Sequence, residues 1–174
     1  MNKIKKNKNI IFVFGLIILG LSFSRLIPHP SNFSPMLAAG IFSGFYFRQF
    51  YISSFLVLFS MFIGDLFLGF HSTMIFTYLA LIISVFIGLY LKKLEFRNVL
   101  YSGLASSVVF FIITNLGAWL VHGIYQKNLY GLLNSYFMAI PFFHNTLIST
   151  LLYLFIFKTI FNFVVKKKVL NNSF

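Results

Sequence analysis

The residues with the strongest capacity to bind a charged or polar solute are few, and they stand in an otherwise apolar chain. Asp65 and Glu95 are the only two acids among 174 residues, and of these Asp65 alone lies inside an apolar stretch. An ionised carboxylate surrounded by hydrocarbon requires a partner or water. Arg25 is the candidate partner, because the charge pattern described below places it on the same side of a membrane as Asp65. The pair has two interpretations: a carboxylate that binds a ligand or cation, or a structural ion pair that locks two loops together.

A second polar group lies on one apolar segment. Ser107, Phe111, Asn115, Trp119 and His122 are spaced by four, four, four and three residues, which places them along one face of a helix. An amide, an indole and an imidazole on one stripe could line a binding site by stacking and hydrogen bonding. The alternative is a helix contact through Asn115, with Trp119 as an anchor at the membrane surface.

The remaining polar residues are expected on the same, outer side of the membrane. They include the first loop, where three prolines among residues 28–35 either hold a shape or only make a short turn. Pro141 is expected to break the start of the last helix, shortly before His144. The candidate solute-binding residues are Arg25, His29, Asn32, Asp65, His71, Asn115, Trp119, His122 and Asn145.

Catalysis, a metal site and a bound cofactor are not expected. The chain has no cysteine, and none of its four histidines is three or four residues from another. A single acid within the membrane provides no acid pair, and no serine has an evident histidine partner. No nucleotide-binding loop of the Gly-x4-Gly-Lys-Ser/Thr type occurs, so energy for transport would come from a partner or an ion gradient.

The composition indicates a membrane protein. Hydrophobic residues make up 59% of the chain and charged residues 9%, against about a quarter in soluble domains. The net charge of +12 is distributed in short clusters between apolar runs, which is typical of membrane loops and argues against a nucleic-acid-binding groove.

The fold expected is an all-α integral membrane protein with about six transmembrane helices. The apolar segments are 10–25, 34–47, 51–68, 73–91, 98–121 and 142–164. The second is shorter than the roughly twenty residues of a full span, so it must be tilted, shielded by neighbours or re-entrant. Residues 125–141 are expected to form a loop with a short interfacial helix. Residues 1–174 form a single membrane domain, with basic cytoplasmic tails at 1–9 and 166–174.

The positive charges predict the orientation. With the N-terminus in the cytoplasm, twelve Lys and Arg lie on the inner side and two, Arg25 and Lys127, on the outer side. Both termini are therefore expected in the cytoplasm, and the location is the inner cell membrane. The alternative is that the first segment is a signal peptide, although it lacks an Ala-x-Ala site.

The second segment carries a stripe of small residues. Ala39, Gly40, Ser43 and Gly44 let another helix approach closely, and that helix is either internal, which is the favoured alternative, or part of a partner subunit.

The sequence also resembles a bacterial family of unknown function whose members are described as candidate transport proteins. The resemblance covers residues 20–160 and is carried by five motifs: Arg25-Leu-Ile-Pro-His-Pro-Ser-Asn-Phe-Ser-Pro35, Asp65-Leu-Phe-Leu-Gly-Phe-His71, Thr114-Asn-Leu-Gly-Ala-Trp119, Tyr130-Gly-Leu132 and Pro141-Phe-Phe-His-Asn145. That family is similar to the substrate-binding S components of energy-coupling-factor (ECF) transporters. The resemblance implies a six-helix bundle that binds a vitamin-like micronutrient near its outer face and docks on a membrane coupling subunit with ATPases.

The function expected is therefore binding or uptake of a small solute from an outward-facing polar cavity, as a subunit of a larger transporter in the lipid bilayer. The alternative is a structural or assembly protein of the cell envelope, because helix packing alone could account for polar residues at helix ends.

Overall fold

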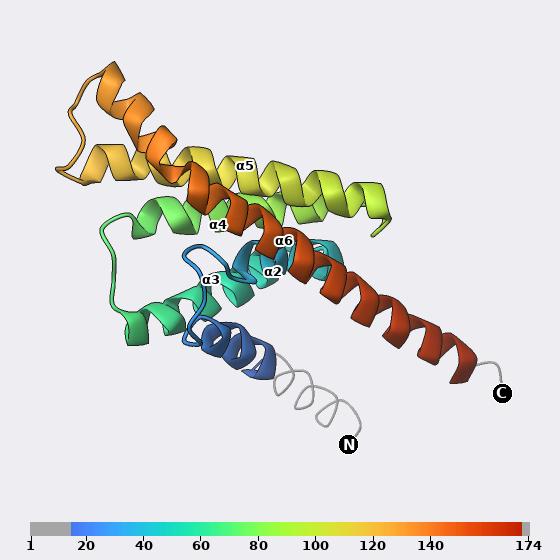
Figure 1. Ribbon diagram of the computed structural model, residues 1–174. Coiled ribbons are helices and arrows are strands. Elements are labelled where there is room, and N and C mark those ends of the chain that lie inside the picture. Colours follow the sequence, from blue (N-terminus) through green and yellow to red (C-terminus); the bar gives the residue numbers. More distant parts are fainter. Residues whose placement is uncertain (1–14, 172–174) are drawn as a thin grey trace.

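The protein is all-α within residues 15–171, which the computed structural model describes, with side chains given to residue 163. A short helix, Gly15–Ser24, is followed by α2 (Met36–Phe47), α3 (Phe50–Leu68), α4 (Met74–Tyr90), α5 (Phe96–Val121) and α6 (Leu129–Asn171) (Figure 1). No strand occurs in this part of the chain. The predicted N-terminal tail, 1–9, lies outside the described residues.

Three of these helices are long and apolar enough to cross a membrane by length and composition. They are α3, α5 and the part of α6 that ends at Phe163. The helix Gly15–Ser24, α2 and α4 are apolar but shorter. Together the apolar helices identify a multi-pass membrane protein, since a chain of this composition must place its exposed apolar side chains against lipid.

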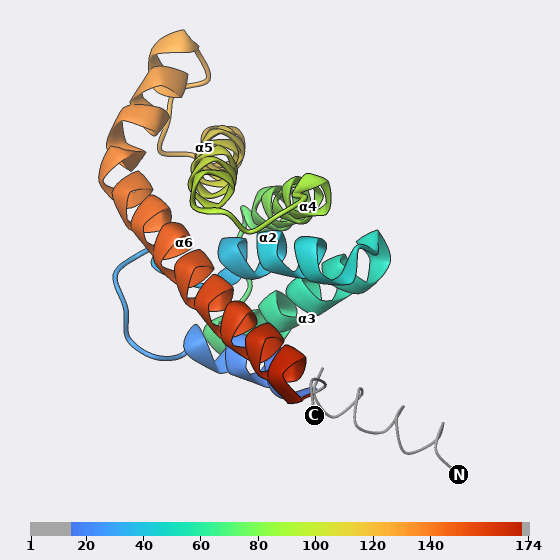
Figure 2. The same ribbon diagram turned by 90° about the vertical axis from the view of Figure 1, so that its right-hand side faces the viewer.

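Helix α2 lies at the centre of the bundle, between α3, α4 and α6 (Figure 2). It has only 12 residues, and eight of them are buried. A helix this short cannot cross the hydrocarbon alone. Its neighbours cover most of its length instead, from Met36 to Gly44. Of the three alternatives for this segment, shielding by neighbouring helices is the one the structure shows.

The small residues of α2 let it lie in direct backbone contact with α4. A Cβ atom added at Gly44 would stand 2.3 Å from the carbonyl oxygen of Val85, and one added at Gly88 would stand 2.0 Å from that of Ile41. At Gly40 the added atom would meet the Ser84 hydroxyl at 1.9 Å. At Gly44 and Gly88 the obstructing atoms belong to the main chain, so these two glycines set the distance between the two helices.

The stripe predicted for helix packing is therefore used inside the chain. Gly40 and Gly44 contact α4, Ala39 lies in the hydrophobic core, and the carbonyl oxygen of Ser43 accepts a hydrogen bond from the Ser53 hydroxyl at 2.9 Å. All four residues are buried. Internal packing is the alternative that the structure supports, and this stripe offers no surface to a partner subunit.

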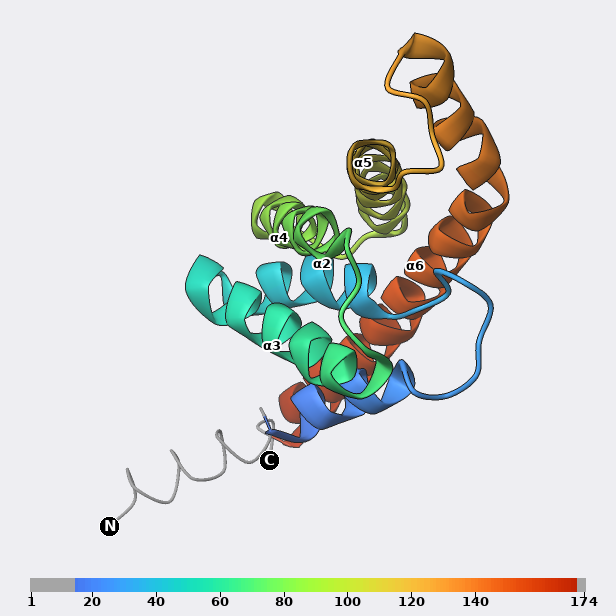
Figure 3. The ribbon, with the colours of Figure 1, turned by 90° about the vertical axis from the view of Figure 1, so that its left-hand side faces the viewer.

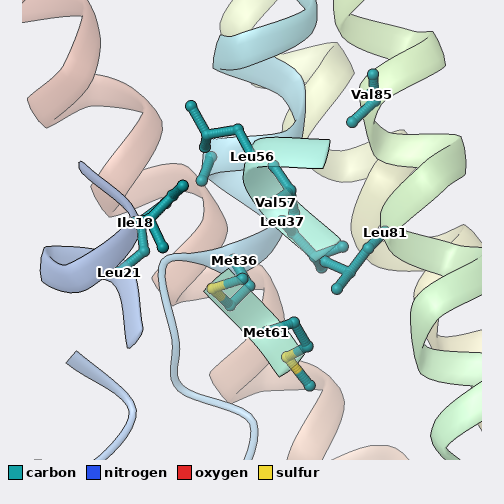
Figure 4. Packing of buried hydrophobic residues seen from close by; sticks show 10 residues of the cluster. Ile18, Leu21, Met36, Leu37, Leu56, Val57, Met61, Leu81 and Val85 are labelled. Atoms are coloured by element: carbon teal, nitrogen blue, oxygen red, sulfur yellow. The ribbon is translucent and has the colours of Figure 1, made fainter. Parts of the chain in front are cut away.

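A hydrophobic core joins the helix Gly15–Ser24 to α2, α3 and α4 (Figure 4). Its buried side chains include Ile18, Leu21, Met36, Leu37, Leu56, Val57, Met61, Leu81 and Val85. A smaller cluster of Ala38, Ile41, Val99 and Leu154 continues the core towards α5 and α6.

The prediction for the last helix was wrong at its N-terminal end. Residues 125–141 were expected to form a loop with a short interfacial helix, with the last membrane helix beginning only at residue 142, but α6 begins at Leu129 and continues through Pro141 to Asn171. Asn128 starts the helix by accepting a hydrogen bond from the Gly131 amide at 2.8 Å, which is an N-cap interaction. The N-terminal part of α6 is bent relative to the rest (Figure 2). Proline in a membrane helix commonly causes such a bend without ending the helix.

We expect Gly88→Ala to destabilise the protein by about 1–3 kcal/mol, because the new methyl group meets a main-chain oxygen that cannot turn away. The measurement is the thermal unfolding of the purified protein in detergent. Gly20→Ala is the matched control, because nothing lies within 4 Å of its added Cβ, and it should leave the midpoint unchanged or slightly raised. Equal midpoints for the two variants would contradict the close approach of α2 and α4.

Candidate functional site

A polar cavity of about 390 Å³ lies at one end of the bundle. Small-molecule sites span roughly 300–1,000 Å³, so a small solute fits. The wall is built from the first loop, the start of α2, the second half of α3, the loop and first turns of α4, the second half of α5 and the middle of α6. Its lining residues are Arg25, His29, Asn32, Ser34, Met36, Leu37, Met61, His71, Thr73, Thr77, Leu81, Phe110, Thr114, Asn115, Thr146, Ser149 and Thr150.

Five of the predicted solute-binding residues come together in this lining, although they are far apart in the sequence. They are Arg25, His29, Asn32, His71 and Asn115. Asp65 lies behind Arg25 rather than on the wall. Trp119, His122 and Asn145 do not line the cavity.

Asp65 is held by two partners from different elements. Its side chain is 1% exposed, and its Oδ1 atom forms an ion pair with Arg25 Nη2 at 2.7 Å. The Tyr78 hydroxyl, on α4, donates a hydrogen bond to Oδ2 at 2.7 Å. These partners compensate the carboxylate for its lost hydration, as a buried charge requires. The predicted Arg25–Asp65 contact is confirmed.

Gly64 makes room for the guanidinium of Arg25. A Cβ atom at position 64 would stand 2.5 Å from Arg25 Nη1. The same nitrogen donates a hydrogen bond to the carbonyl oxygen of Met61 at 2.8 Å. Arg25 therefore crosses α3 at a glycine, and its side chain joins the first loop to α3 while one face of it borders the cavity.

The hydroxyl groups of the lining were not predicted. Thr146, Ser149 and Thr150 lie on α6, and their spacing of three and four residues puts them on one helical face, which was a usable signal in the sequence. The Thr150 hydroxyl is fully buried and has no hydrogen-bond partner among the described residues. Thr77 and Thr114 add hydroxyls from α4 and α5. Tyr78, which donates a hydrogen bond to Asp65, was also missed.

The first loop has a defined shape. The Phe33 amide donates to the carbonyl oxygen of Pro30 at 2.9 Å, closing a turn in which Asn32 has a φ of 63°. Asn145 on α6 donates to the carbonyl oxygen of Ser31 at 3.0 Å, and the Phe33 ring packs edge-on against another residue of α6. Figure 3 shows the loop arching from the helix Gly15–Ser24 towards α6. These contacts support the shape-holding interpretation and give Asn145 a positioning role.

Trp119 serves the connection between α5 and α6. Its indole N–H donates to the carbonyl oxygen of Gln126 at 2.9 Å, and the Lys127 ammonium lies 5.6 Å from the centre of its ring. The same ammonium donates to the carbonyl oxygens of Trp119 and Leu120 at the end of α5. Trp119 therefore holds the α5–α6 connection in place. His122 follows directly as the residue that ends α5.

Asn115 lines the cavity from α5. Its side-chain N–H group donates to the carbonyl oxygen of Phe111 in the same helix at 2.7 Å. Its Oδ1 atom has no hydrogen-bond partner within the described part of the chain. In the same part of the chain, no three His, Asp or Glu side chains come together in a group that could hold a metal ion. The arrangement can therefore recognise a solute by hydrogen bonds and by the charge of Arg25.

Over residues 5–172 the sequence matches the model of a family described as a family of unknown function (DUF6580). No curated protein and no solved structure matches the chain. The contacts described above are therefore the observations from which the role of the cavity can be inferred.

We expect Asp65→Asn to lower the free energy of unfolding by about 3–5 kcal/mol, because it leaves the Arg25 guanidinium buried without a counter-charge. In the double variant Arg25→Gln/Asp65→Asn the two neutral amides can hydrogen-bond, and most of this loss should be recovered. Thermal unfolding of the two single variants and the double variant in detergent gives the coupling between the sites. Additive losses would show that the pair does not act as a unit.

Proposed function

The chain belongs to the family DUF6580, whose function is unknown, and we propose that it binds a small solute in the polar cavity as the substrate-binding subunit of a membrane transporter. The cavity is the observation that supports this proposal most directly. It is about 390 Å³ in volume, and polar side chains from the first loop, the α3–α4 loop, α4, α5 and α6 line it together with apolar side chains of α2 and α3.

The free-energy cost of polar groups inside a membrane bundle supports a binding role for this lining. Polar groups within a membrane bundle are costly unless they have partners. Asp65 is paired with Arg25, whereas the Asn115 oxygen has no partner among the described contacts. A bound solute or the water that it displaces would complete the hydrogen bonding of this oxygen.

The proposed orientation places the cavity on the outer side, with both termini in the cytoplasm. The described basic residues that mark the inner side are Arg48, Lys92, Lys93, Arg97 and Lys158. Arg48 follows α2, the two lysines follow α4, and Arg97 is at the start of α5. These helix ends are opposite to those that form the cavity. The positive-inside rule then supports an opening towards the outside of the inner cell membrane.

Resemblance to the S components of ECF transporters supports the same role and adds a partner. S components are six-helix proteins that bind micronutrients, and six helices occur within residues 15–171. The chain has no nucleotide-binding loop of the Gly-x4-Gly-Lys-Ser/Thr type. The partner proposed is a membrane coupling subunit with ATPases, and the solute proposed is of the vitamin-like class.

The alternative function is a structural or assembly role in the cell envelope. The observation that favours it is the internal use of several polar residues. Asp65 forms an ion pair with Arg25 and accepts a hydrogen bond from Tyr78, and Trp119 holds the α5–α6 connection. The two functions differ in what the cavity contains when the protein is isolated.

We expect Thr114→Leu to abolish the recovery of a bound solute, because the larger apolar side chain fills the cavity and removes a hydroxyl. Protein purified from native membranes in mild detergent would be analysed by mass spectrometry for small molecules and for co-purifying subunits. Val108→Leu is the matched control on the same helix, because Val108 is 37% exposed and does not line the cavity.

A small molecule present with wild type and Val108→Leu, and at least about tenfold lower with Thr114→Leu, is the expected result; that ratio corresponds to a loss of about 1.4 kcal/mol. Co-purifying ATPases and a membrane coupling protein would support the proposed partner. Recovery of envelope-assembly proteins without any small molecule would overturn the proposal in favour of the alternative.

We also expect sided labelling to place the cavity outside. The sequence has no cysteine, so single substitutions give unique reporters. In intact cells, a membrane-impermeant maleimide should label Gly123→Cys, in the α5–α6 connection, and should label Lys92→Cys, in the α4–α5 connection, only after the membrane is permeabilised. The reverse pattern would put the cavity on the cytoplasmic side and contradict the orientation.

A further inference from the structure

The cavity has one charged side chain on its wall, and that charge is positive. Arg25 lines the cavity, whereas Asp65 does not and is only 1% exposed. None of the described lining residues carries a carboxylate. The ion pair is therefore oriented, with its cationic end towards the cavity and its anionic end buried between α3 and α4. An oriented pair of this kind makes the adjoining space electropositive.

Arg25 retains hydrogen-bond donors for a solute. A guanidinium has five N–H groups. Among the described contacts, Nη1 bonds the carbonyl oxygen of Met61 and Nη2 bonds Asp65. The side chain remains 12% exposed at the cavity. The remaining N–H groups suit a carbonyl or carboxylate oxygen.

The wall formed by α5 and α6 has the opposite hydrogen-bonding character. The hydroxyls of Thr114 and Thr146 donate their hydrogens to main-chain oxygens of their own helices, at 2.8 and 3.0 Å, and that of Ser149 does the same at 3.0 Å. Asn115 likewise uses one of its two side-chain N–H groups within α5, and its oxygen has no partner among the described contacts. The hydroxyls of Thr114, Thr146 and Ser149 therefore present oxygen lone pairs on this wall, as does the Asn115 oxygen.

From these two walls we infer the chemical class of the solute. It carries a carbonyl or carboxylate group that faces Arg25, O–H or N–H groups that face the hydroxyls of α5 and α6, and no cationic group. A cation would enter beside the guanidinium with no carboxylate on the wall to compensate its charge. The inference rests on the proposed function of the cavity as a solute site and defines what that site selects.

The test measures the polarity of the cavity without knowledge of the solute. Thr114→Cys places a thiol on the α5 wall of a chain that has no other cysteine. The rates of its reaction with two methanethiosulfonates of similar size are compared, one bearing a sulfonate and the other a trimethylammonium group. Each rate is divided by the rate of the same reagent with the exposed reporter Gly123→Cys. The measurement is made at pH 8, where free imidazoles are neutral.

We expect the normalised rate with the sulfonate reagent to exceed that with the ammonium reagent by about threefold or more. Equal rates, or a faster reaction with the ammonium reagent, would overturn the assigned selectivity and leave solute binding itself intact. A failure of Thr114→Cys to react with either reagent, while Gly123→Cys reacts with both, would instead show that the cavity is closed to solutes, and the proposed function would fail with it.

The source of the preference is tested by removing the pair. In Arg25→Gln/Asp65→Asn both charges are lost together, so no buried charge is left alone, and the ratio at Thr114→Cys should fall to about one. A preserved preference would overturn the assignment to Arg25. If this double variant does not fold, Thr77→Cys in the otherwise unchanged chain provides a second reporter on the α4 wall. It should show the same preference, and its absence there would contradict the inference.

Discussion

A single carboxylate in an apolar bundle determines how one end of this molecule is organised. Asp65 cannot be hydrated where it lies, so the chain must bring a cation and a hydroxyl to it. Arg25 comes from the end of the first helix and Tyr78 from α4, while Asp65 itself stands on α3. Three elements are therefore fixed at one point. The loop that follows Arg25 begins from this point and is held at its far side by Asn145, so the ion pair also determines where the cavity wall stands.

The other end of the molecule is governed by the absence of side chains. Gly44 and Gly88 let the backbones of α2 and α4 come into contact. Because α2 has only 12 residues, its neighbours can cover most of it. Close contact of this kind replaces the hydrophobic effect, which provides no attraction between helices that lipid already solvates. The space between the helices is filled below the cavity by the cores around Val57 and Ile41. The polar end is open and the remainder of the bundle is packed.

The sequence was sufficient to predict the features that depend on rare charged residues or on the length of apolar runs. Asp65 has one plausible partner because arginine is rare on its side, and the apolar runs predict most helices to within a few residues. It was insufficient where common residues act together. Threonine is ordinary in membrane helices, so the cavity role of Thr150 depends on which face of α6 meets the other helices. Pro141 misled the prediction because a membrane helix can pass through a proline, provided that the freed main-chain groups find other partners.

The arrangement of these two ends agrees with the proposed role of the chain in binding a solute rather than in unassisted passage. A solute that enters among the lining residues meets Arg25 on one side and the hydroxyls of α5 and α6 on the other. Below it, a path would require α2 and α4 to part at Gly44 and Gly88, where backbone lies against backbone, and the core around Val57 to open. Packed interfaces of this kind have discrete arrangements and do not yield gradually. Movement of a solute across the membrane would therefore need an input of free energy that changes the position of whole helices, and a coupling subunit driven by ATPases can supply that input.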